Sequence, residues 1–116
     1  MKFKGKVLKG KGRGKEMGFP TANLKIPVEI ENGLYFGLAD TKPSLVFVGA
    51  AETFGEIKQK VEVYILDFEG NLYDRELEVE LIKKTRPSIK FKTKEELIEQ
   101  MKEDEKMARE FFKSNK

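Results

Sequence analysis

The sequence contains no cysteine, no histidine and no tryptophan. Without them the chain can form no disulfide, no Cys- or His-ligated zinc site, and no catalytic dyad or triad that uses histidine or cysteine. Any chemistry must therefore rest on carboxylates, lysines, hydroxyls and backbone amides, with a hard metal ion held by oxygen atoms.

Long apolar runs are also missing, since none approaches the roughly 18 residues needed to cross a bilayer. No membrane span or secretory signal is readable, so we expect a cytoplasmic protein without a membrane partner. The 116 residues have room for one compact domain, which we place at 1–116. The expected form is a monomer.

Charge is abundant but nearly balanced, with 23 Lys+Arg against 20 Asp+Glu. From Lys2 to Lys15 every charged residue is basic, so this end can attract anions. A small barrel that binds RNA or single-stranded DNA is one alternative. Phe3 is the only aromatic residue among these lysines, and one ring is a poor platform for stacking several bases. We therefore expect no nucleic-acid partner.

Alternating residues, which are the pattern of half-buried strands, predict strands over 1–8, 61–66 and 77–82. Apolar runs divided by Asp40 to Pro43 predict two more strands over 34–39 and 45–51, and short elements and turns are expected over 19–33. Asp67 to Asn71 predicts a hairpin turn between the strands over 61–66 and 77–82.

The period changes at the C-terminal end, where Thr93 and Glu96 form a capping-box signature. The apolar residues that follow lie on one helical face: Leu97, Ile98, Met101, Ala108, Phe111 and Phe112. About six strands and one terminal helix favour a mainly β fold, a small antiparallel barrel with the helix packed across it.

Glycines at 10, 12, 14 and 18 make a loop whose backbone amides could surround phosphate oxygens. The loop matches neither the Walker nor the dinucleotide fingerprint, so a solvated connection is the alternative. Thr21 and Asn23 are two residues apart and offer oxygens that suit Mg²⁺, or they hydrogen-bond a turn. Glu62 alternates with valines, as Glu78 alternates with Leu77 and Val79, so composition alone does not single it out.

The order of several strings closely resembles riboflavin kinase of the bacterial and eukaryotic type. The strings are Gly12 to Leu24 with its Gly-Phe-Pro-Thr-Ala-Asn core, Gly33-Leu-Tyr35, Val61 to Tyr73, Glu76 to Val79, Arg86-Pro87 and the acidic helix ending at Phe112. The resemblance implies a six-stranded antiparallel Greek-key β-barrel with a C-terminal amphipathic helix. It also implies transfer of the γ-phosphoryl group of ATP to the 5′-hydroxyl of riboflavin, forming FMN and ADP.

The resemblance assigns roles to individual residues. Glu62 matches the catalytic acid/base, while Thr21 and Asn23 match the residues that hold Mg²⁺ and the nucleotide phosphates. Arg86 and Phe91 match the segment that contacts the flavin. The remaining matches lie along the phosphate flap and near the nucleotide: Gly12, Gly14, Lys15, Gly18, Pro20, Phe68 and Tyr73.

The sequence departs from many bacterial members, which carry Asn-Ile-Gly at Phe47-Val-Gly49, Arg-Pro-Thr-Phe at Ala51-Glu52-Thr-Phe54 and Arg-Pro-Glu at Arg86-Pro-Ser88. These changes keep open a second interpretation, a catalytically weakened barrel that binds flavin or nucleotide. The adenylyltransferase usually fused to this module carries a histidine motif, which a chain without histidine cannot contain. We therefore expect a kinase domain without the FAD synthetase half.

Overall fold

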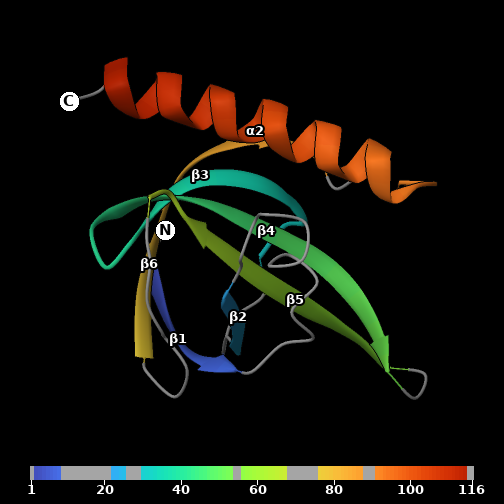
Figure 1. The fold of residues 1–116 in the computed structure, drawn as a ribbon. Helices are drawn as coiled ribbons and strands as arrows, with labels where there is room; N and C mark the ends of the chain where they lie inside the picture. Colours follow the sequence, from blue (N-terminus) through green and yellow to red (C-terminus); the bar gives the residue numbers. More distant parts are fainter. Residues whose placement is uncertain are drawn as a thin grey trace.

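The computed structural model describes residues 2–8, 22–25, 30–53, 56–67, 76–87 and 91–114. In these ranges the strands pair in antiparallel fashion and close into a barrel, in the order β1-β2-β5-β4-β3-β6 (Figure 1). The mainly β, antiparallel fold with a C-terminal helix is confirmed. The elements are β1 (Lys2–Leu8), β2 (Ala22–Lys25), β3 (Gly33–Ala39), β4 (Lys42–Thr53), β5 (Glu56–Ile65), β6 (Glu76–Arg86) and α2 (Lys94–Ser114).

The predicted hairpin between 61–66 and 77–82 is wrong. β5 pairs with β2 and β4, whereas β6 pairs with β1 and β3, so the two strands are not neighbours in the barrel. Alternation shows which face of a strand is buried but not which strand lies beside it. Closure of the barrel takes both edges of β6, and none is left for β5.

A tight turn joins β3 to β4. Asp40 and Thr41 have positive φ angles of 48° and 71° between the paired residues Ala39 and Lys42, as in a type I′ hairpin. The backbone amide of Asp40 donates to the carbonyl of Glu78 at 2.8 Å, and its Oδ1 accepts from the amide of Glu78 at 2.9 Å. The turn is thereby fastened to β6.

The barrel interior is filled by the apolar positions of the alternating strands. Val61, Val63 and Ile65 of β5 lie there, as the alternation predicts. Tyr64 of the same strand and Leu66, just after its end, face outward into a second apolar cluster. Among the residues that the structure describes, ten others are buried there: Phe3, Val7, Leu24, Ile30, Tyr35, Ala39, Val46, Val48, Leu77 and Val79.

The second apolar cluster holds α2 against the outside of the barrel, next to β3 (Figure 1). The ring of Phe36 lies 4.9 Å from that of Phe111 and 6.3 Å from that of Phe112, centroid to centroid. Thr93 Oγ1 accepts from the amide of Glu96 at 3.1 Å, so the predicted cap is present. All six predicted apolar residues of the helix belong to this cluster. No helix within the described ranges is long and apolar enough to cross a membrane.

Polar contacts fix α2 to the end of β5. Arg109 donates from Nη1 and Nη2 to both carboxylate oxygens of Asp67, each at 2.9 Å, and also binds Glu105. Tyr64 Oη donates to Glu105 Oε1 at 3.3 Å. Burial and the nearby Glu105 raise the pKa of Tyr64, so its hydroxyl stays protonated and can donate.

The Arg109 contact makes a testable contribution to acid stability. Its hydrogen bonds and charge hold the pKa of Asp67 below the ordinary value. A lowered folded-state pKa stabilises the protein above the ordinary pKa of about 4, and the stabilisation is lost as pH falls through the lowered value. Asp67→Asn should therefore lower Tm slightly at neutral pH and not in strong acid. Thermal melts across pH test this, and a difference that grows in acid would contradict it.

Candidate active site

Glu62 lies on the outer face of β5, because its neighbours Val61 and Val63 both point into the barrel. Its Cα partner on β4 is Phe47, and its partner on β2 is Asn23. Phe47 in turn pairs with Leu34 of β3, and Leu34 with Arg86 of β6. We call these five positions the Glu62 row.

The row places Asn23 and Glu62 directly opposite each other on neighbouring strands. Residues at opposed positions of an antiparallel pair share one face of the sheet, so an asparagine position and a glutamate position are neighbours here. Amide and carboxylate oxygens are ligands of the kind that Mg²⁺ accepts, with phosphates and water completing its shell. Among the described residues, no three acidic side chains gather into a metal-binding group.

The other side of Glu62 is apolar. Phe47 is half-buried and packs into the cluster beneath α2 together with Leu97 and Ile98, which are also half-buried. Glu62 itself is partly exposed. The carboxylate therefore lies at a border, with an asparagine position beside it on β2 and an apolar surface on β4.

At the far end of the row, Arg86 reaches α2. Its Nε donates to Asp104 Oδ1 at 3.0 Å and its Nη2 to Asp104 Oδ2 at 2.6 Å. The side chains are 16% and 4% exposed, so this ion pair is buried. Gln100 Nε2 also donates to Asp104 Oδ1, at 3.0 Å.

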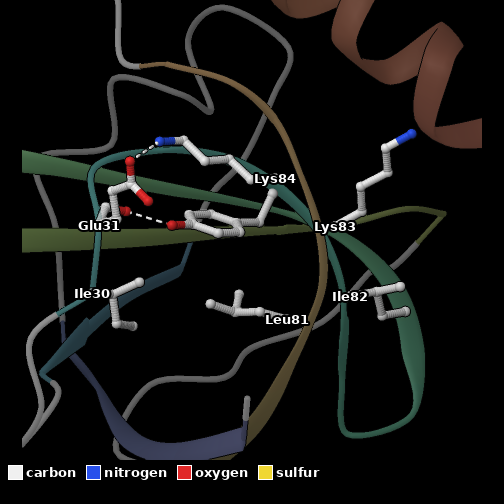
Figure 2. Close-up of a pocket in the computed structure, with 7 residues that line it drawn as sticks. Ile30, Glu31, Leu81, Ile82, Lys83 and Lys84 are labelled. Carbon is white, nitrogen blue, oxygen red and sulfur yellow. Dashed lines mark hydrogen bonds and ion pairs between the residues drawn. The ribbon is translucent and has the colours of Figure 1, made fainter.

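A cavity of about 360 Å³ opens elsewhere, beside the second half of β6. Figure 2 shows Lys84 reaching across it to Glu31, whose carboxylate lies 2.7 Å from the ammonium. Tyr35 and Leu81 line it from the barrel interior, whereas Glu62 is on the outer face. The cavity and the Glu62 row are thus separate features.

Comparison with known families decides what this arrangement belongs to. The flavokinase family model, described as riboflavin kinase, matches residues 1–112. The chain belongs to the riboflavin kinase family. The resemblance seen in the sequence is thereby confirmed.

Individual relatives are also named as riboflavin kinases. The chain is 36% identical over 115 residues to the bifunctional riboflavin kinase/FMN adenylyltransferase of Escherichia coli K12, covering 93% of this chain and 37% of that protein. It is 31% identical over 106 residues to the RNA-binding riboflavin kinase RibR of Bacillus subtilis, covering 86% and 46%. The chain thus spans less than half the length of either relative.

A solved structure shares the fold of this chain. The structure is that of a protein named macrolide-efflux protein, from Streptococcus pneumoniae, and it superposes with a TM-score of 0.85 at 29% identity. The match covers 93% of this chain and 38% of that chain.

Three of the site residues predicted for this chain lie in one row in the structure, namely Asn23, Glu62 and Arg86. Phe91 is half-buried and lies just before the helix cap, outside the row. The other predicted site residues fall outside the described residues: Gly12, Gly14, Lys15, Gly18, Pro20, Thr21, Phe68 and Tyr73.

Asp104, which binds Arg86 at the end of the row, was not predicted from the sequence. Asp104 lies three residues after Met101 and four before Ala108, so it occupies the apolar face of the helix. A carboxylate on such a face is rarely buried without a partner. The position therefore signalled a buried cation opposite, which the structure identifies as Arg86.

Proposed function

We propose that the chain is a riboflavin kinase, which transfers the γ-phosphoryl group of ATP to the 5′-hydroxyl of riboflavin and releases FMN and ADP. The barrel would be the six-stranded Greek-key barrel of the family. The register that sets Asn23 opposite Glu62 supports this proposal most directly, because it places an asparagine and a glutamate at neighbouring positions on one face, where a metal ligand and a proton acceptor are needed.

In the proposed mechanism Glu62 accepts a hydrogen bond from the 5′-hydroxyl and orients its oxygen toward the γ-phosphorus. As the new P–O bond forms and the bond to ADP breaks, the hydroxyl proton passes to the Glu62 carboxylate. Phosphoryl transfer depends mainly on positioning and charge neutralisation, so the proton can move late and a strongly basic group is unnecessary.

On the nucleotide side, Thr21 and Asn23 would hold Mg²⁺, which supplies positive charge to the phosphate oxygens. Amides of the loop with Gly12, Gly14 and Gly18, together with the Lys15 ammonium, would bind the phosphates. Pro20, Phe68 and Tyr73 would border the nucleotide, and Phe91 the flavin.

The reaction is tested by incubating the purified protein with riboflavin, Mg²⁺ and either ATP, CTP or GTP, and resolving the flavins by chromatography. We expect FMN with ATP. If none of the triphosphates gives FMN although riboflavin fluorescence is quenched, the alternative holds, and the chain is a flavin-binding barrel without turnover.

Asn23→Ala should weaken the use of Mg²⁺ and ATP, because it removes an oxygen ligand from a metal that tolerates few geometries. We expect an increase of about tenfold or more in the Mg²⁺ concentration for half-maximal rate. Asn32→Ala, the same change at an exposed asparagine outside the row, is the control and should leave it unchanged. An unaltered Mg²⁺ dependence in Asn23→Ala would count against the assignment.

We propose riboflavin and ATP as the partners of a cytoplasmic monomer, with no nucleic acid or membrane bound. The RNA-binding name of the Bacillus subtilis relative makes RNA the alternative to test. Binding measured across salt concentrations decides this, because contacts to phosphates lose affinity steeply as salt rises. We expect no binding at low salt, and tight, salt-sensitive binding would overturn this part of the proposal.

A further inference from the structure

Each nitrogen of the Arg86 guanidinium donates a hydrogen bond within the protein. Nε and Nη2 bind the two oxygens of Asp104 at 3.0 and 2.6 Å, and Nη1 donates to the carbonyl of Pro87 at 3.2 Å. A bidentate pair of this kind is short, directional and charge-assisted. To bind a substrate through the same face of its guanidinium, Arg86 would have to leave a carboxylate that is only 4% exposed.

The Arg86–Asp104 pair connects α2 to the row that contains Glu62. Arg86, Leu34, Phe47 and Glu62 are successive Cα partners across β6, β3, β4 and β5, so Arg86 is three strand spacings, or roughly 14 Å, from Glu62. The Arg86–Asp104 contact therefore joins the helix to the barrel at the opposite end of the row from the carboxylate.

The barrel and α2 both contribute to an apolar surface in the outer cluster. Phe47 contributes from the barrel, and Leu97 and Ile98 contribute from the first turns of α2. All three are half-buried, and Phe47 is the Cα partner of Glu62 in the row. The contact at Asp104 is one of those that set the position of α2 and of this surface, together with the ring contact between Phe36 and Phe111 and the Arg109–Asp67 pair.

We propose that Arg86 is a positioning residue, which acts on the flavin by holding Asp104 and α2 in place rather than by touching the substrate. The inference rests on the proposed function, since the apolar surface next to Glu62 is where the ring system of riboflavin would lie. Under the proposed function the ATP phosphates would lie on the β2 side of Glu62, so the pair should affect flavin binding and not nucleotide binding.

Single and double apolar variants distinguish this role from direct contact. Arg86→Met and Asp104→Leu each leave one buried charge unpaired, whereas the double variant removes both charges and keeps the volume filled. We expect each single variant to raise the riboflavin KM and Kd by about tenfold, and the double variant to return them to within about threefold of wild type. The ATP KM should stay within about twofold throughout.

The measurements use riboflavin fluorescence quenching and steady-state kinetics, at a temperature where melts show every variant folded. Lys102→Met, at an exposed site of the same helix, is the matched control and should change nothing. If Arg86→Met does not fold, Arg86→Lys replaces it, and the loss of the bidentate contact should still raise the riboflavin KM.

Three results would overturn the inference. Tight flavin binding by Asp104→Leu would mean that a freed Arg86 contacts the flavin itself. A double variant that binds riboflavin as weakly as Arg86→Met would mean the same. Folded single variants with unchanged riboflavin KM and Kd would show that the pair only stabilises the fold. A wild-type protein that neither forms FMN nor quenches riboflavin would instead refute the proposed function, and the inference with it.

Discussion

Glu62→Gln is expected to lower kcat by a factor of roughly 10² or more, the usual range for the loss of an acid/base group. Glutamine keeps the size of the side chain and can still contact the substrate hydroxyl, but it cannot accept the proton. Riboflavin and ATP should therefore still bind, with dissociation constants near those of wild type, and the loss should fall on turnover.

The control for this variant is Glu78→Gln. Glu78 alternates with buried residues on β6 just as Glu62 does on β5, but it is exposed and lies outside the row. Turnover by Glu78→Gln should match wild type. Near-normal kcat in Glu62→Gln, measured by FMN formation under saturating substrates, would show that Glu62 is not the proton acceptor.

Leu34→Ala is expected to lower the free energy of unfolding by about 2–5 kcal/mol. Leu34 is 1% exposed and packs in the cluster between the barrel and α2, so its truncation leaves a cavity that the surrounding sheet cannot easily close. The corresponding fall in Tm is on the order of 10 °C.

Urea denaturation of Leu34→Ala and of Ile82→Ala tests this expectation. Ile82 is 47% exposed, and its truncation should change the free energy of unfolding by no more than about 0.5–1 kcal/mol. Equal effects of the two substitutions would contradict the packing described for the outer cluster. A larger loss at Ile82 would do so more strongly.

Local patterns predicted the local structure well. Alternation in 61–66 correctly separated the barrel interior from the outer face, and Thr93 with Glu96 correctly marked the helix start. These succeeded because the side-chain period of a strand and the cap of a helix are decided by residues close in sequence.

Strand partners could not be predicted in this way. The hairpin predicted after Asp67 failed because β6 pairs with β1 and β3, and partner choice depends on closure of the whole barrel. The same limit applies to the site: a glutamate between valines became distinctive only when the register set it opposite Asn23. The family resemblance pointed to Glu62 and Arg86 but not to Asp104, whose place on the apolar face of the helix signals a buried cation that the packing of α2 identifies as Arg86.

The most direct test of the account follows the transferred group itself. The purified protein is incubated with Mg²⁺, riboflavin and ATP that carries a radiolabel in its γ-phosphate, and the products are separated by chromatography. If the chain is a riboflavin kinase, the label will appear in FMN in step with ADP formation. Label that remains in ATP, or that is released only as inorganic phosphate, would contradict it.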